Sequence, residues 1–394
     1  MSKILILSVF FHLLTGITIE SWARAEGFRT ALPGYRLSFP RDHGAHEEFQ
    51  TEWWYYTGHL HTADGKSYGY ELTFFRKGNR EPIVIQNPSR WSVRDLYLAH
   101  FALTDPSGNR FWYREKISRE GLGKAGAESN RLLVHIDDWR AESIGDKIVL
   151  TAREEGNDIR LELTSEKPVV LQGHDGLSQK GPMPGEASYY YSLTRLRTSG
   201  MLRINGAETR VDGLSWMDHE FFSTPKNDPQ GPDQYLSGWD WFAIQLDNRC
   251  ELMFYRLRER DGSNSPFSAG SLILPDGTTE PLSLSKIRLT PLSEWKSLET
   301  GATYPIRWKL EVPEKKIALN LEPLLPQQEL VTPKSTRVVY WEGALRAEGS
   351  WRGAPVSGEG YLEMTGYGTL SSSSGRGIKF GPARTPVTLS PPTK

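Results

Sequence analysis

The feature that most constrains the fold is an internal repeat. The hexapeptide ELTFFR at residues 71–76 matches ELMFYR at residues 251–256, a spacing of 180 residues. Each hexapeptide follows an aromatic segment across a turn, EWWYY at residues 52–56 and GWDWF at residues 238–242. This period is far longer than the roughly 20–50 residues of solenoid repeats. The repeat therefore predicts that a whole domain has been duplicated.

Turn signals indicate that each copy is built from strands. Short apolar runs are separated by turn-forming pairs such as Asp64-Gly65, Asn205-Gly206 and Asp261-Gly262, which are typical of β-hairpins. The 37 glycines and 25 prolines also favour turns, and helical periodicity is weak throughout. We expect an all-β protein with two tandem lipocalin-like β-barrel (or barrel/sandwich) domains, related by internal duplication.

The repeat and the local composition set the expected domain boundaries. The N-terminal lipocalin-like domain is predicted over residues 32–224 and the C-terminal one over residues 233–381. Residues 225–232 are rich in Pro, Asn, Asp and Gly and are expected to form a linker. Residues 382–394 contain four prolines and no periodicity, which predicts an extended tail.

The N-terminus has the pattern of a signal peptide. Lys3 is followed by an apolar run over residues 4–17 and by Ala23-Arg24-Ala25, a small-x-small cleavage pattern. We therefore expect residues 1–25 to be removed and the mature protein to be periplasmic or secreted. The apolar run is too short to span a membrane, and no later segment reaches 18 apolar residues, so the mature chain is predicted to lack a transmembrane segment.

Charge and cysteine content exclude several classes of function. The 47 basic and 48 acidic residues nearly cancel, which argues against a nucleic-acid binder and against a polybasic membrane-surface protein. The single cysteine, Cys250, excludes an intrachain disulfide and a cysteine-based metal site. The histidines that begin with His43 and His46 raise a metal hypothesis, but strict ligand spacing is missing. We therefore expect no metal and no cofactor, and interpret this stretch as a polar rim on an aromatic pocket.

The densest group of titratable residues is Asp218-His219-Glu220, within SWMDHEFF at residues 215–222. A carboxylate beside a histidine suits general acid–base catalysis, because their pKa values can be tuned toward neutral pH. Strand alternation places His219 on one face, and Trp216, Asp218 and Glu220 on the other. The second copy has no matching Asp-His pair, which favours a site in the first copy. The alternative is a polar cluster that only completes hydrogen bonds at a strand end.

A second candidate acid is Asp240, which lies between Trp239 and Trp241. Burial would raise the pKa of this carboxyl and make it a proton donor; on the outer face it would be a solvated side chain. We predict His219, Asp218 and Asp240 as catalytic residues. The expected ligand-binding residues, around an apolar pocket near the domain junction, are Glu52, Trp54, Tyr56, His100, Tyr190, Arg195, Trp216, Glu220 and Trp239.

The segment 51–58, with Asp42-His43 before it and WMDHEF at residues 216–221 after it, resembles the hydroxyneurosporene synthase (carotenoid 1,2-hydratase)-like family. Secreted bacterial members of that family are called AttH-like proteins or secreted hydrolases. The resemblance implies two lipocalin-like domains and, in the carotenoid hydratases, cofactor-independent addition of water to a C=C bond. It matches His219 and Asp240 to acid–base residues of the family, with Phe221 and Gly238 in place of a tryptophan and a tyrosine.

Two functions from different classes follow. The first is an exported, cofactor-independent hydratase, lyase or isomerase that acts on an apolar, terpenoid or lipid-like substrate by acid–base chemistry. The second is a non-catalytic periplasmic lipocalin-like binding protein for an apolar ligand, linked to a membrane export system. A catalytic protein requires its acid–base residues to converge on one cavity, whereas a binding protein needs only an apolar lining with a few polar groups.

Overall fold

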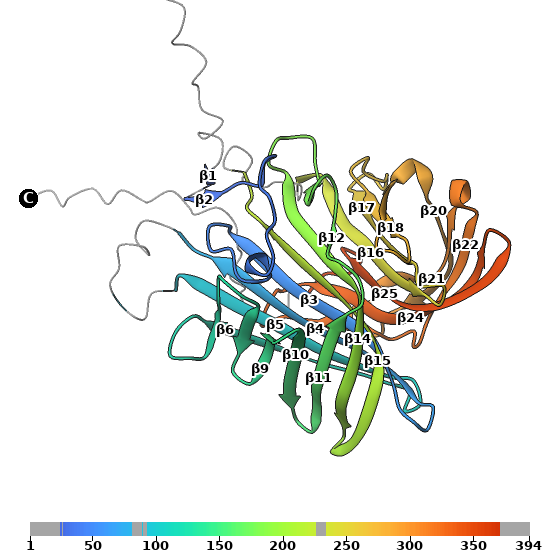
Figure 1. Cartoon of the computed structure of the whole chain (residues 1–394), viewed down its shortest axis with the longest axis horizontal. Helices are drawn as coiled ribbons and strands as arrows, with labels where there is room; N and C mark the ends of the chain where they lie inside the picture. Colours follow the sequence, from blue (N-terminus) through green and yellow to red (C-terminus); the bar gives the residue numbers. More distant parts are fainter. Residues whose placement is uncertain (1–23, 26, 81–88, 90–92, 226–233, 371–394) are drawn as a thin grey trace, which may run out of the picture.

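The computed structural model describes residues 24–25, 27–80, 89, 93–225 and 234–370. Apart from Arg24, Ala25 and Pro225, the expected signal peptide, linker and tail lie outside the described residues. Among the described residues, no helix combines the length and apolar composition of a membrane span. The fold is all-β as predicted, and its strands form two large antiparallel sheets (Figure 1).

The first sheet curls into a barrel-like domain. Its order is β6-β5-β4-β3-β15-β14-β11-β10-β9-β8-β7, and β12 and β13 both pair with β14. Its strands are β3 (Thr51–His61), β4 (Ser67–Gly78), β5 (Asp95–Asp105), β6 (Arg110–Arg119), β7 (Ala125–Ala127), β8 (Leu133–Ile136), β9 (Trp139–Ile144), β10 (Lys147–Glu154), β11 (Asn157–Ser165), β12 (Val170–Leu171), β13 (Leu177–Gln179), β14 (Ala187–Ile204) and β15 (Ala207–Phe222).

The second sheet forms a second barrel-like domain. Its order is β19-β18-β17-β16-β25-β24-β22-β21-β20, and β23 pairs with β24. Its strands are β16 (Leu236–Leu246), β17 (Glu251–Glu259), β18 (Ala269–Ile273), β19 (Thr279–Ser283), β20 (Arg288–Lys296), β21 (Thr303–Val312), β22 (Ile317–Pro323), β23 (Glu329–Val331), β24 (Val339–Trp351) and β25 (Ala354–Thr365). Short 3-10 turns, η4 (Leu284–Lys286) and η5 (Pro313–Lys315), join some of them.

The strand order around the closing pair is the same in both sheets, which confirms the internal duplication. In each half the first strand pairs with the last, β3 with β15 and β16 with β25, and three further strands follow on the side of the first strand. Glu71 and Glu251, which define the repeat, lie in the equivalent strands β4 and β17. Their positions within the strands differ, since Glu71 is the fifth residue of β4 and Glu251 the first of β17.

Strand alternation divides the aromatic residues of β3 between two cores. Trp54 and Tyr56 point into the first barrel, where they pack among its fully buried residues. Tyr55 points the other way and packs against the second half, beside Trp241. Each half therefore has its own core, and a third core, rich in aromatic side chains, joins the halves.

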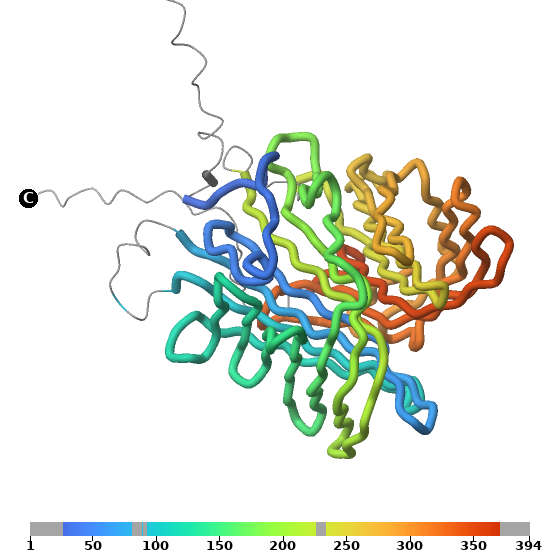
Figure 2. Tube along the Cα trace, in the orientation of Figure 1, coloured from blue at the N-terminus to red at the C-terminus, as the bar shows by residue number. Residues whose placement is uncertain are grey.

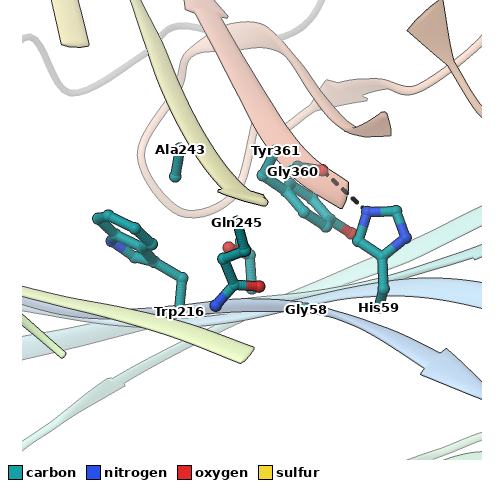
Figure 3. Close-up of a pocket in the computed structure, with 8 residues that line it drawn as sticks. Gly58, His59, Trp216, Ala243, Gln245, Gly360 and Tyr361 are labelled. Atoms are coloured by element: carbon teal, nitrogen blue, oxygen red, sulfur yellow. Dashed lines mark hydrogen bonds between the residues drawn. The ribbon is translucent and has the colours of Figure 1, made fainter. Parts of the chain in front are cut away.

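The junction between the halves is tightly packed. Gly69 allows close approach there, because a Cβ at this position would lie 2.5 Å from the Cβ of Ala344. A cavity at the junction, lined by residues such as Trp216, Gln245 and Tyr361, has a volume of about 10 Å³ (Figure 3). That volume holds about one water molecule, so this part of the junction does not provide the apolar ligand pocket that we expected.

The segment that precedes β3 covers one end of the first barrel. It follows the short pair β1 (Arg24–Ala25) and β2 (Phe28–Arg29), and contains a 3-10 turn, η2 (Arg41–His43). Its backbone is tied across the barrel end, where Ala45 N donates to Glu128 O at 2.7 Å. Figure 2 shows this segment in blue against the first barrel. It brings several polar side chains to the end of the barrel.

Candidate functional site

The candidate site is a buried polar cluster inside the end of the first barrel. Alternation along β15 turns His219 into the barrel, opposite Tyr191 of β14 and Trp54 of β3 in the sheet register. His219 is fully buried, and its ring stacks on that of Trp54 with 4.9 Å between centroids. The neighbouring strands thus fix the position of the ring.

A continuous chain of hydrogen bonds passes through His219. On one side, Tyr191 Oη lies 2.9 Å from His219 Nδ1 and 2.7 Å from His43 Nδ1. On the other, His219 Nε2 lies 2.9 Å from Glu52 Oε1, which also contacts His46 Nδ1 at 2.7 Å. We call these five residues the histidine relay: His43, Tyr191, His219, Glu52 and His46.

The far end of the relay is anchored by a network of charged groups. His46 Nε2 lies 3.2 Å from Asp42 Oδ1, and Asp42 also pairs with Arg41 at 2.5 Å. Burial would raise the pKa of Asp42, but hydrogen bonds from His46 and Arg41 hold it well below its usual value. The relay therefore connects His43, at the surface, to the ionised carboxylate of Asp42 in the segment that precedes β3.

The charge on Glu52 fixes the direction of the hydrogen bonds. Burial alone would raise the pKa of Glu52, but the Arg76 guanidinium, 3.0 Å from Oε2, and hydrogen bonds from His219 and His46 hold it well below its usual value. An ionised carboxylate only accepts, so both histidines donate to it. His219, whose pKa is lowered by burial, then presents the Nδ1 lone pair to the Tyr191 hydroxyl.

The open end of the relay is His43. If Tyr191 donates to His219, its oxygen accepts from His43 Nδ1, and His43 Nε2 keeps a free lone pair. His43 is half-buried, whereas the rest of the relay is fully buried. Burial, with the charge of His219 as a smaller cause, lowers the pKa of His43 to about 4. The relay is thus neutral at its surface end near pH 7.

Three residues of the relay are of the types that bind metals, but their hydrogen bonding does not fit a bound cation. Within the part of the chain that the structure describes, one ligand atom each from His46, Glu52 and His219 lie within 4.8 Å of one another. Both histidine nitrogens, however, already donate to the same Glu52 oxygen, and the other oxygen holds Arg76. A metal would have to displace two protons beside a buried guanidinium, and this disfavours its binding.

Asp218 lies on the opposite face of β15 from His219, as alternation predicts. Its carboxylate accepts from Tyr190 Oη at 2.6 Å, Ser192 Oγ at 2.5 Å and Trp216 Nε1 at 2.7 Å. Burial raises the pKa of Asp218 to about 7, although these hydrogen bonds oppose the shift. The residue that contacts His219 is therefore Glu52, and Asp218 faces the junction between the halves.

Several of the predicted ligand-binding residues gather with Asp218 at the junction. Glu220 accepts a short hydrogen bond from Ser188 and lies 3.3 Å from Lys180 Nζ. Lys180 Nζ is also 3.9 Å from the ring centroid of Tyr255 in the second half. Tyr190 and Trp216 belong to the aromatic core that joins the halves, and Trp239, at 38% exposure, lies toward the surface.

Asp240 is held in an ion-pair network of the second half. Its fully buried carboxylate contacts Arg256 Nε at 2.7 Å, forms a short ion pair with Arg258 and accepts from Tyr367 Oη at 2.9 Å. These groups use both of its oxygens. The structure therefore does not bring the three predicted catalytic residues together, because they occupy the first barrel, the junction and the second half.

The remaining predicted residues have separate positions. Arg195 pairs with Glu251 across the junction, and His100 Nδ1 lies 2.6 Å from Tyr340 Oη of the second half. Tyr56 is fully buried in the first barrel. Glu52 and Trp54 do contact His219.

The sequence did not lead us to several residues that form the relay or bind to it. Tyr191 and Arg76 were not singled out, and His43 and His46 were discussed only as a rim. The signal that could have found Arg76 is its place in the repeated hexapeptide. The signal for Tyr191 is its alternation with Tyr190 on a strand that pairs with the one holding His219.

Comparison with known proteins identifies the family. The AttH-like family model matches residues 30–367, which includes both halves. The chain belongs to the AttH-like family. A crystal structure of a candidate AttH protein from Nitrosomonas europaea has 34% sequence identity and a TM-score of 0.76, covering 86% of this chain and 100% of that one. No curated protein matches the chain significantly.

A more distant structure shares the fold. The kievitone hydratase of Nectria haematococca has 16% sequence identity and a TM-score of 0.64, with coverage of 88% of this chain and 98% of that one. At this identity the similarity establishes the common architecture alone. The AttH-like fold of two tandem barrels therefore extends to a protein named for hydratase activity.

Proposed function

We propose that this AttH-like protein is a hydratase-type enzyme that adds water to, or removes it from, an apolar small molecule by acid–base chemistry. The reaction centre is at His43, the half-buried end of the histidine relay. The observation that carries this proposal is the unbroken hydrogen-bond chain from His43 through Tyr191 and His219 to the ionised Glu52. Such a chain supplies both a base and a place to store a proton.

The proposed reaction uses the relay as a reversible proton carrier. His43 Nε2 takes a proton from the attacking water while its Nδ1 proton passes to Tyr191, and the Tyr191 proton passes to His219 Nδ1. The resulting imidazolium lies 2.9 Å from Glu52 Oε1, which stabilises its charge. The reverse transfer delivers one proton to the substrate carbon, so that H and OH are added and the relay is restored.

The surroundings of His43 support an apolar substrate. The Phe39 ring lies 4.7 Å from that of His43, and its side chain is only partly buried. The fold shared with a kievitone hydratase further supports a hydration reaction. We also propose that the protein is exported after cleavage near Ala25, on the basis of its N-terminal sequence.

The test is a screen of apolar alkenes and enones with the full chain in ¹⁸O-labelled water, in which a hydrated product gains the label. Tyr191→Phe breaks the relay and is expected to reduce turnover by about 10²–10⁴-fold. Tyr190→Phe is the matched control, since it changes the adjacent tyrosine on the other face of β14.

Two results would contradict the proposed function. Equal turnover by Tyr191→Phe and wild type would exclude the relay as the proton carrier. Tight binding of an apolar compound without any label incorporation would favour the binding-protein function instead. Export is tested separately, since an intact Met1 on protein from native cells would exclude cleavage near Ala25.

A further inference from the structure

A second histidine pair meets a carboxylate where the two halves approach each other, away from the relay. His59 and His61 both lie on β3, and alternation places them on the same face, toward the second half. Glu359 reaches them from β25. Its Oε1 atom lies 3.0 Å from His61 Nε2 and 3.5 Å from His59 Nδ1.

The hydrogen bonding of His59 leaves a buried lone pair. His59 Nε2 lies 2.9 Å from the Gly360 carbonyl oxygen, which can only accept, so this nitrogen carries the proton (Figure 3). In the neutral ring, Nδ1 then bears a lone pair, and it has no hydrogen-bond partner among the described residues. Figure 3 shows this second nitrogen turned away from the small junction cavity.

The nearest charged group to this lone pair is another acceptor. The Glu359 carboxylate faces His59 Nδ1 without a hydrogen bond between them. Two electron-rich atoms in a site that is mostly buried repel each other, and a buried polar atom without a partner lowers stability. A cation between them would remove both penalties.

The His61 ring also has a hydrogen-bond partner for the nitrogen that would not bind the metal. His61 Nε2 lies 3.1 Å from Glu359 Oε2, and His61 Nδ1 lies 3.1 Å from Ser67 Oγ. When the ring carries its proton on Nδ1 and donates it to Ser67, Nε2 bears a lone pair, and a metal ion can then replace the proton between Nε2 and the Glu359 carboxylate. Histidine ligands in metal sites usually donate their second nitrogen in this way, to a carbonyl or other acceptor. His59 has this arrangement through Gly360 and His61 through Ser67.

We propose that His59 Nδ1, His61 Nε2 and the Glu359 carboxylate bind a divalent transition-metal ion of the Zn²⁺ class, which fastens β3 of the first half to β25 of the second. Two imidazoles and one carboxylate form a common zinc ligand set, with the fourth position open to water. The His61 side chain is 40% exposed, so the ion can enter from solvent.

Binding requires a small movement of His61. The three ligand atoms are not all within 4.8 Å of one another, in contrast to those of His46, Glu52 and His219. Zn–N bonds of about 2.0–2.1 Å bring two ligand nitrogens closer than this, so the half-exposed His61 ring must turn toward His59. Arg346, opposite Glu359 in the β24–β25 register, opposes a cation by its charge.

The test is calorimetric titration of the EDTA-treated full chain with Zn²⁺. We expect one ion per chain and a rise in melting temperature on binding. His61→Ala and His59→Ala should each weaken binding by at least about 100-fold and abolish the rise, because each removes one ligand from the set. Arg346→Gln should strengthen binding several-fold. His174→Ala, which changes a histidine with a 94% exposed side chain, is the matched control and should bind as wild type does.

The outcomes separate this site from the relay. Loss of binding in His61→Ala with retention in His219→Ala supports the proposal, and hydratase activity is not needed for this measurement. Three results would overturn it: no binding of Zn²⁺ by the wild-type chain, undiminished binding by His61→Ala, or binding that is lost in His219→Ala but kept in His61→Ala.

Discussion

Replacing Tyr191 by phenylalanine removes a single heavy atom from the relay, the hydroxyl oxygen. The hydroxyl joins two histidines, at 2.9 Å from His219 Nδ1 and 2.7 Å from His43 Nδ1. Its removal leaves the fully buried His219 nitrogen without a donor, at a cost of about 1–3 kcal/mol. His43 is half-buried and can bond to water instead, so it adds little. We therefore expect Tyr191→Phe to lower the free energy of unfolding by about 1–3 kcal/mol.

Tyr56→Phe provides a control in the same barrel. Tyr56 is as deeply buried as Tyr191, but its hydroxyl has no hydrogen-bond partner among the described residues. Removing that hydroxyl should leave stability unchanged or raise it slightly, because an unsatisfied polar group is lost. Urea unfolding of both variants, followed by tryptophan fluorescence, measures the difference. Equal changes in the two variants would refute the assignment of the Tyr191 hydrogen bonds.

Three further predictions concern other residues. His219→Ala should destabilise by about 2–5 kcal/mol, because it leaves a cavity and removes one hydrogen bond from the buried Glu52 carboxylate; a wild-type melting temperature would contradict this. Asp240→Asn should cost about 3–5 kcal/mol in urea unfolding, since two arginines lose their partner; a neutral result would show that solvent screens the pair. Burial raises the pKa of Glu71 to about 8, so the folded state keeps a proton that the unfolded state loses near pH 4.5. Stability should therefore fall between pH 5 and pH 8, and Glu71→Gln should reduce that fall by about 1–3 kcal/mol; equal slopes in both proteins would exclude Glu71 as the cause.

The fold was predictable because its main signals are repeated in the sequence. Hairpin turns are encoded by neighbouring residues, and the repeated hexapeptide occurs once in each half. The all-β class and the duplication therefore follow from the residues alone. The repeat did not predict that Glu251 begins its strand whereas Glu71 is the fifth residue of its own, because the start of a strand depends on the length of the preceding turn, which differs between the halves. The opposite orientations of His219 and Asp218 were also predictable, since alternation has a fixed period of two.

The assembly of the site depended on long-range packing. Glu52 is 167 residues from His219 in sequence, and only the pairing of β3 with β15 brings them together. Asp240 was a reasonable acid by its aromatic neighbours, but Arg256 and Arg258, one strand away, hold it in ion pairs. No local pattern distinguishes a free buried carboxylate from a paired one.

The pairing of the first strand with the last has a consequence for how the chain folds. Thr51 pairs with Phe222, so the first barrel cannot close until nearly all of its residues are available. Contacts of such high sequence separation make folding slow, because the chain must lose loop entropy before the contact forms. Glu52 comes from the first strand and His219 from the last, so their hydrogen bond forms only at closure. The stacking of Trp54, also on the first strand, against His219 likewise forms only at that closure.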